Sequence, residues 1–222
     1  MKPTKKPSQT PLARSLGGNV RQTPLTLFER ATAKWLKGER LDLSELANEL
    51  GVARTTIFRW VGTREQLYGE VLSAVYGGLR AEILRTTPGQ GLERLERVTR
   101  RTLNALANAA PLRTFLAQDP EFAIHVLTSK SSPVQDRSVR LEVELLREVM
   151  REANIEPRLD IETLAFVIVR IAEAFLYADV MSGRKPEIEK AVAAISILAG
   201  AEPRRTKASP AQATSSRRKR RS

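Results

Sequence analysis

Apolar side chains recur every three or four residues through nearly all of the stretch from residue 23 to residue 202. One clear example is the series Leu67, Val71, Val75 and Leu79, in which each residue lies about one helical turn beyond the last. This spacing places apolar residues on one face of an α-helix, whereas a half-buried β-strand needs strict alternation of apolar and polar residues. Because that alternation is missing, the sequence predicts an all-α fold with no strands.

Glycines, prolines and capping residues divide this stretch into separate helices. Asp42 with Glu45, and Thr63 with Gln66, have the three-residue spacing of a capping box, which marks the start of a helix. The expected helices cover residues 24–37, 42–50, 54–61, 63–85, 92–106, 112–118, 121–129, 134–153, 160–182 and 187–199.

The net positive charge of the chain lies outside the expected fold. The 222 residues include 37 Lys and Arg against 25 Asp and Glu, a formal net charge of +12. Residues 1–22 carry five basic residues and residues 203–222 carry eight, with no acidic residue in either segment, while residues 23–202 have a net charge of −1. Because neither terminal segment shows hydrophobic periodicity, we expect both to be disordered basic tails.

The C-terminal tail ends in a block of five consecutive cations, which would contact the phosphates of a nucleic acid without reading its sequence. This block consists of Arg217, Arg218, Lys219, Arg220 and Arg221. Solubilising termini and a nuclear-targeting signal are the alternatives.

If the tails bind phosphates in this way, a chain cut to residues 23–202 should bind DNA with a weaker dependence on salt. The slope of log affinity against log salt concentration is expected to fall by about 0.9 for each phosphate that the shortened chain no longer neutralises. Titrations of the full and shortened chains over a range of salt concentrations measure this slope, and equal slopes would argue against a role for the tails.

Several classes of function are disfavoured by composition. The chain has no cysteine and one histidine, His125, which excludes disulfides, thiolate zinc sites and sites with several histidines. No paired carboxylates in a cleft pattern and no glycine-rich phosphate loop are found, so we expect no enzyme, no catalytic residues, no metal and no cofactor. With no long apolar run and no secretory signal, we expect a cytoplasmic, nucleoid-associated protein with no membrane partner.

Residues 42–61 have the pattern of a helix-turn-helix. Two short helices meet at Gly51, which allows the positive φ that the turn needs, and Ala47 provides a small side chain where the helices touch. Apolar residues that would fix the crossing angle stand at Leu46, Leu50, Val52 and Ile57. An ordinary helical hairpin is the alternative interpretation.

The second of these helices has a polar face that could enter the major groove of DNA. Arg54 and Arg59 can read guanine, and Thr55 and Thr56 can reach a phosphate or the methyl group of thymine. The spacing therefore predicts a double-stranded DNA operator as a partner.

Residues 46–67 resemble the DNA-binding domain of TetR-family transcriptional regulators, and residues 59–67 and 169–179 resemble the QsdR-like subgroup of that family. The resemblance implies that Arg54, Thr55 and Phe58 approach bases and that Thr56 and Arg64 contact phosphates. Trp60 would either lie on the DNA or pack inward. Three departures stand out. Ala53 replaces the usual serine cap, Phe58 replaces a common tyrosine, which removes one hydrogen bond to phosphate, and Trp60 replaces a frequent histidine.

The resemblance also implies a ligand-binding and dimerisation domain in the second part of the chain. The helices expected over residues 160–182 and 187–199 are apolar on more than one face, which fits pairing with a second copy in a homodimer. The QsdR-like subgroup is associated with lactone signals, so a small amphipathic lactone is one candidate effector. A buried helix in a monomer is the alternative to the dimer.

Five residues are candidates for effector binding: Phe115, His125, Phe166, Arg170 and Glu173. Each has a simpler interpretation. The two phenylalanines would be core residues, and His125 would be hydrogen-bonded in the core. Arg170 and Glu173 would pair across a helical turn.

The sequence thus predicts four segments. They are a basic tail over residues 1–22, a helix-turn-helix domain over residues 23–70 with its fourth helix reaching about residue 85, a regulatory and dimerisation domain over residues 86–202, and a basic tail over residues 203–222. Gly77 and Gly78 lie in the connecting helix and predict either a hinge or close helix packing.

The predicted function is that of a sequence-specific transcriptional regulator, a homodimeric repressor released from its operator by a small amphipathic ligand. The alternative is a ligand-independent or non-specific DNA-coating protein that uses its basic tails.

Overall fold

The computed structural model describes residues 22–201, and both basic tails, with the cation block at residues 217–221, lie outside the described residues. Residues 22–201 form α-helices and connecting turns, with no strand among them, so the all-α prediction is confirmed. No helix in this range is long and apolar enough to cross a membrane.

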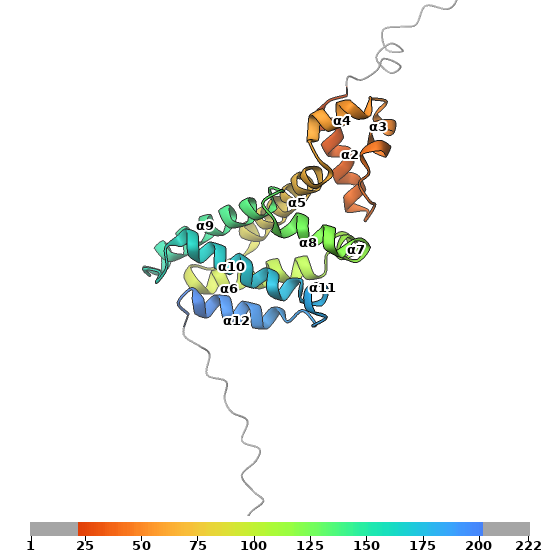
Figure 1. The fold of residues 1–222 in the computed structure, drawn as a ribbon. Coiled ribbons are helices and arrows are strands. Elements are labelled where there is room, and N and C mark those ends of the chain that lie inside the picture. Colours follow the sequence, from red (N-terminus) through yellow and green to blue (C-terminus); the bar gives the residue numbers. More distant parts are fainter. Residues whose placement is uncertain (1–21, 202–222) are drawn as a thin grey trace, which may run out of the picture.

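Three short helices form a compact head at one end of the molecule (Figure 1). They are α2 (Pro24–Leu36), α3 (Leu43–Leu50) and α4 (Arg54–Val61). Their apolar faces meet in a small core that includes Leu27, Leu46 and Ile57, each fully shielded from solvent.

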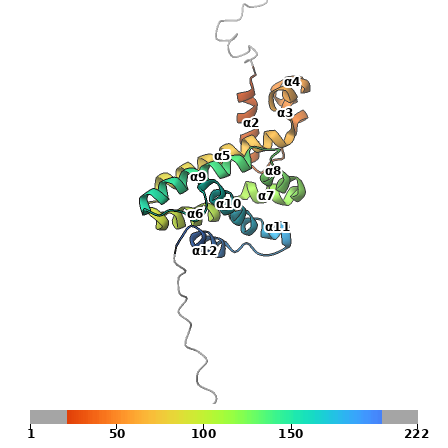
Figure 2. The same cartoon turned by 60° about the vertical axis from the view of Figure 1, so that its left-hand side comes forward.

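The long helix α5 (Arg64–Thr86) leads from the head into a larger helical body. Figure 2 shows α5 running beside α9 (Val134–Ala153). The body also contains α6 (Gly91–Ala107), α10 (Ile161–Leu176) and α12 (Ile188–Leu198), which pack on one another and on α9 around a second apolar core. Two short helices, α7 (Ala110–Gln118) and α8 (Pro120–Thr128), lie where the body faces the head.

The helix starts follow the local sequence. Thr63 accepts a hydrogen bond from the backbone of Gln66, and the Gln66 side chain accepts one from the backbone of Thr63, which completes the predicted capping box. Asp42 accepts from the backbone N–H groups of Ser44 and Glu45. Because these contacts involve residues within one turn, sequence is sufficient to predict them.

One predicted helix is wrong in its extent. The segment predicted as a single helix over residues 160–182 is divided into α10, which ends at Leu176, and α11 (Ala178–Ser182). The break falls at Tyr177, whose side chain is buried against the core that the head shares with α7 and α8. It also brings Asp179 to within 2.6 Å of Arg113 on α7. Packing against distant residues therefore interrupts the helix, and local helix propensity gives no information about such packing.

Helix α5 runs without interruption through Gly77 and Gly78. A Cβ atom at Gly78 would meet nothing within 4 Å, so close packing does not explain that glycine, and a Cβ at Gly77 would lie 3.4 Å from the guanidinium of Arg137. The hinge remains a prediction.

Gly69, earlier in α5, is the glycine that close packing does require. A Cβ atom there would lie 2.5 Å from Pro133 Cδ and 2.7 Å from Ser132 Cβ in the turn before α9. We expect Gly69→Ala to lower the free energy of unfolding by about 1–3 kcal/mol through overpacking. The matched control Gly78→Ala, in the same helix but facing open space, should raise it by about 0.5–1 kcal/mol. Urea unfolding of both variants measures the difference, and equal effects would show that the two sites do not differ in packing.

Candidate DNA interface and effector cavity

Helices α3 and α4 have the geometry of a helix-turn-helix. Gly51 ends α3 in the left-handed region, with φ of 64°. The backbone N–H of Val52 then donates to the carbonyl of Ala47 at 3.0 Å, and Ala47 is buried between the helices. The positive φ favours glycine, and the buried small side chain permits the close approach, as the sequence pattern indicates.

The outer face of α4 carries exposed polar and aromatic side chains. Arg54, Thr55, Phe58 and Arg59 are exposed, whereas Ile57 points into the head core. The guanidinium of Arg54 lies 5.3 Å from the ring centre of Phe58, so the two side chains form one surface. No side chain caps α4 at Ala53.

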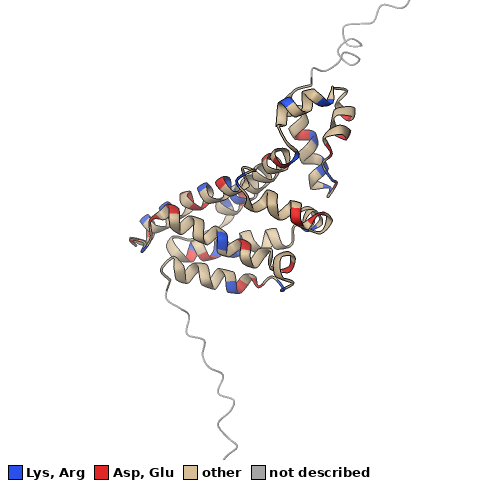
Figure 3. Ribbon diagram, viewed as in Figure 1, with Lys and Arg blue, Asp and Glu red and all other residues tan. Residues whose placement is uncertain are grey.

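Salt bridges among the described residues of the head join α2 to α3 and do not involve the arginines of α4. On α2, Lys34 lies 2.7 Å from Glu49 of α3, and Arg30 lies 3.7 Å from the same carboxylate. No salt bridge within the described residues joins Arg54 or Arg59 to an acidic side chain. Figure 3 shows the basic positions of α4 and the acidic positions of α3 on the head. Residues 23–70 carry seven basic and seven acidic residues, so their net charge is zero, yet they can present positive charge where α4 is exposed.

Two residues of the predicted DNA-binding set have roles in packing. Arg64 donates from Nε to the carbonyl of Leu41 at 3.2 Å, and its guanidinium lies 4.2 Å from the ring centre of Phe122 on α8. These contacts place the side chain at the junction of head and body, and the phosphate contact implied by the resemblance stays a prediction. Trp60 is half-buried and packs against the core, and Thr56 is also half-buried.

The junction also links the body to the loop between α2 and α3. The Leu41 N–H donates to the Tyr68 hydroxyl at 2.8 Å, and the Gln118 side chain of α7 donates to the carbonyl of Gly38 at 3.2 Å. Arg40 lies 3.5 Å from Asp119. Movement of α7 would therefore be passed to the head through this loop.

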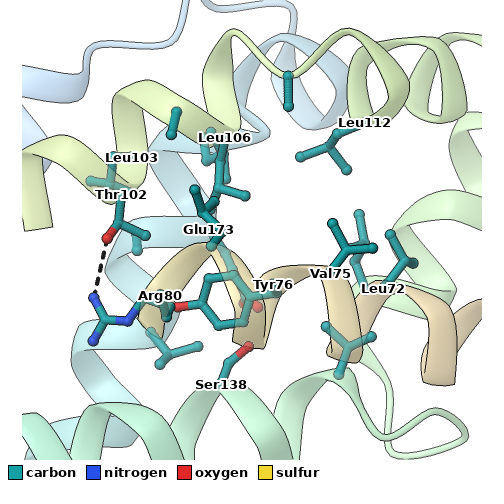
Figure 4. Close-up of a pocket in the computed structure, with 18 of the residues that line it drawn as sticks. Leu72, Val75, Tyr76, Arg80, Thr102, Leu103, Leu106, Leu112, Ser138 and Glu173 are labelled. Carbon is teal, nitrogen blue, oxygen red and sulfur yellow. Dashed lines mark hydrogen bonds between the residues drawn. The ribbon is translucent and has the colours of Figure 1, made fainter. Parts of the chain in front are cut away.

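The body contains a partly open cavity of about 300 Å³ with mostly apolar walls. Its lining comes mainly from α5, α6, α9 and α10, with further residues from α7, α8 and α12 and with Trp35 and Leu36 from the last turn of α2. Figure 4 shows that Arg80, Thr102, Tyr76, Ser138 and Glu173 lie toward one end, with Leu72, Val75 and Leu112 toward the other.

Four of the five predicted effector-binding residues do not line this cavity: Phe115, His125, Phe166 and Arg170. Phe115 is buried and stacks on Tyr68 with ring centres 4.8 Å apart, at the junction. His125 is exposed, with Nε2 3.1 Å from the Ser131 hydroxyl, so the predicted core role is wrong. Phe166 is 49% exposed on α10, so it belongs neither to the core nor to the cavity. A phenylalanine or histidine on a helical face carries no signal of which neighbour that face will meet.

The predicted pair of Arg170 and Glu173 does form, at 2.6 Å, across one turn of α10. Glu173 lines the cavity and also accepts a hydrogen bond from Gln135, while Arg170 stands outside the lining. Burial raises the pKa of the Glu173 carboxyl, and the nearby Arg170 opposes this shift.

The buried ion pair on the cavity wall was not predicted from the sequence. Arg80 on α5 lies 3.0 Å from Glu142 on α9 and donates to Thr102 on α6 at 3.2 Å. Burial raises the pKa of the Glu142 carboxyl, against the attraction of Arg80, and burial likewise raises the pKa of Tyr76. An arginine in an amphipathic helix normally indicates a solvated face, so nothing in the sequence distinguishes Arg80 from the exposed arginines.

A helix-turn-helix head joined by one long helix to a helical body with an internal cavity defines a DNA-binding transcriptional regulator. A family model described as the C-terminal domain of tetracyclin repressor-like proteins matches residues 90–200. The chain belongs to the TetR family of transcriptional regulators, whose members are generally not enzymes.

Two solved structures are similar to this chain. The TetR-family transcriptional repressor QsdR of R. erythropolis is 29% identical, with a TM-score of 0.75 over 80% of this chain and 94% of that one. A putative transcriptional regulator from Pseudomonas aeruginosa PAO1 is 17% identical, with a TM-score of 0.48 over 82% and 92% of the two chains. Comparison with curated proteins found no match.

Proposed function

We propose that this regulator is a homodimeric repressor that leaves its operator when a small amphipathic molecule occupies the cavity. The observation that carries the proposal is the position of Trp35 and Leu36, which belong to the DNA-binding head and yet form part of the cavity wall. A molecule in the cavity would touch the head directly. A ligand can shift the equilibrium between two orientations of the head only if its contacts with the protein differ between them.

The route from the cavity to DNA is short. Pro111 and Leu112 of α7 line the cavity, and Gln118 at the end of the same helix is bonded to the loop between α2 and α3. Displacing α7 or the last turn of α2 would tilt the head relative to the body. In a dimer, two tilted heads no longer match two half-sites spaced about one turn of DNA apart. The similarity to a solved TetR-family repressor supports repression as the direction of control.

The dimer is supported by apolar side chains left on the surface of the last long helices. Phe166 on α10 is 49% exposed and Ile197 on α12 is 52% exposed, with Ala193 also exposed on α12. Since α10 and α12 pack side by side, these residues can form one patch, which a second copy would cover.

Reading of the operator is assigned to Arg54, Thr55, Phe58 and Arg59, with the half-buried Thr56 and Trp60 at the edges of the same helix. We expect Arg54→Ala and Arg59→Ala each to weaken specific binding by about 5- to 150-fold, the range for one good base contact, and to relax the choice of base. Arg184→Ala removes one exposed cation outside the head and serves as the control. Binding curves on operator and random DNA measure both effects, and equal weakening on the two DNAs would indicate phosphate contact only.

Footprinting tests the function as a whole. We expect a protected site with two-fold symmetry on DNA selected from the source genome, and loss of protection when an effector is added. A small lactone stays one candidate for that effector. Uniform coating of the DNA would favour the non-specific alternative, and protection that no ligand relieves would favour a ligand-independent regulator.

A further inference from the structure

The polar end of the cavity holds hydrogen-bonding atoms that the protein itself does not satisfy. Oε1 of Glu142 and Nε of Arg80 are both buried, and neither has a hydrogen-bond partner among the described residues. Glu142 is 6% exposed and Arg80 is 2% exposed. Buried polar groups are nearly always paired, because an unpaired one loses its hydrogen bond to water without gaining another. One acceptor and one donor therefore remain open on the same ion pair.

Two hydroxyl groups on the cavity wall can relay hydrogen bonds between these atoms and a bound molecule. No hydrogen bond within the described residues occupies the hydroxyl of Tyr76 or that of Ser138. Both side chains line the same cavity as Arg80 and Glu173, and Tyr76 lies near enough to these charges for them to affect its pKa (Figure 4). Since a hydroxyl both donates and accepts, either one can relay a hydrogen bond from a bound molecule to the ion pair.

The charges around this end leave no cation free for an anionic ligand. The wall contributes Arg80, Glu142 and Glu173, and Arg170 pairs with Glu173 from outside the lining. Each arginine thus already faces one carboxylate. A carboxylate ligand would add a third negative group to a buried site, where like charges repel strongly. A cationic ligand would satisfy Oε1 of Glu142 but would lie against Arg80.

We propose that the cavity takes a neutral molecule with an apolar tail and an amide-type head that both donates and accepts hydrogen bonds. The head would lie at Glu142, Arg80 and Tyr76, and the tail would point toward Leu72 and Val75 (Figure 4). A simple lactone has acceptors only, so it would leave Oε1 of Glu142 unpaired. This ligand class rests on the effector role proposed above for the cavity.

Four probes with the same eight-carbon skeleton test the ligand class on the full chain: octanamide, γ-octalactone, octanoate and octylammonium. Binding is followed by calorimetry and by the fluorescence of Trp35, which lines the cavity and is the single tryptophan left in a Trp60→Phe background. We expect octanamide to bind at least about 10-fold tighter than the lactone and about 100-fold tighter than octanoate or octylammonium, because the others leave a buried group unpaired or place like charges together. The proposal would be overturned if octanamide and the lactone bound equally well, or if either charged probe bound more tightly than octanamide. It would also be overturned if none of the four probes bound.

A double variant tests whether the ion pair is what selects the head. Arg80→Met with Glu142→Leu replaces the pair by apolar side chains of similar size, which proteins usually tolerate. It should still bind γ-octalactone and should lose the preference for octanamide. The control, Arg94→Met with Glu148→Leu, removes an ion pair of 2.7 Å between α6 and α9 that does not line the cavity, and the preference should survive there. A preference that survives in the first variant would contradict the assignment.

Binding without DNA separates this proposal from the function above. If octanamide binds as expected but leaves the protein on its operator, the ligand class stands and the release mechanism fails. If octanoate releases the operator while octanamide does not bind, the release mechanism stands and the ligand class is wrong.

Discussion

Glu142→Ala is expected to lower the free energy of unfolding by about 3–5 kcal/mol, a larger effect than that of Gly69→Ala. The change leaves the guanidinium of Arg80 buried at 2% exposure without its counter-charge, 3.0 Å from the position that the carboxylate occupied. The remaining partner of Arg80, the hydroxyl of Thr102, is neutral and cannot replace a carboxylate. Urea unfolding followed by circular dichroism, at one fixed protein concentration, measures the change in stability.

The control for this destabilisation removes both charges. In Arg80→Met with Glu142→Leu no charge is left unpaired, so the free energy of unfolding should lie within about 1–2 kcal/mol of the original chain. If the double variant is as unstable as Glu142→Ala, packing volume and not charge pairing holds α5 against α9 at this point. If Glu142→Ala leaves the free energy of unfolding unchanged, water reaches Arg80 and the ion pair is not enclosed.

If the proposed dimer forms through α10 and α12, Phe166→Glu combined with Ile197→Glu should convert it into monomers and weaken operator binding by at least about 100-fold. Both side chains are half-exposed in the single chain, so charges there cost little in a monomer. Buried against a second copy, the same charges would have no partner and would repel their counterparts across a two-fold axis. Sedimentation velocity measures the state of association, and binding to a two-half-site operator measures the consequence.

Ala81→Glu is the control for the dimer experiment. Ala81 is exposed on α5, outside the α10 and α12 surface, so the same charge change there should leave both the dimer and operator binding unchanged. A double variant that stays dimeric would place the interface elsewhere. A monomer that binds the operator as tightly as the original chain would show that pairing is not needed for recognition.

The parts of the molecule that could be predicted are those governed by neighbours in sequence. Gly51 takes the left-handed conformation, Ala47 is buried beside it, and Thr63 with Gln66 forms a capping box. Each of these features is a contact within about five residues, so composition and spacing contain the needed information. The head and the exposed face of α4 were accordingly recognisable from the sequence.

The cavity in the body could not be predicted in the same way. Its wall joins Trp35, Arg80, Glu142 and Glu173, which come from four helices spread over the chain. Phe166 was predicted to be a core or ligand residue and is exposed, while Arg80 was not predicted to have a role and is among the most buried side chains. Helical periodicity shows which residues share a face, but not whether that face meets solvent, a second copy or the interior.

Sequence alone thus determined the all-α fold, the helix-turn-helix and the concentration of net positive charge in the two terminal segments, because turn geometry, capping and charge are local properties. Tertiary structure alone decided that Arg64 holds the head to α8, that the helix after Asp160 is interrupted at Tyr177, and that a buried ion pair lies on the wall of an apolar cavity. The physical reason is burial, since the role of a charged or aromatic side chain depends on which distant helices remove it from water.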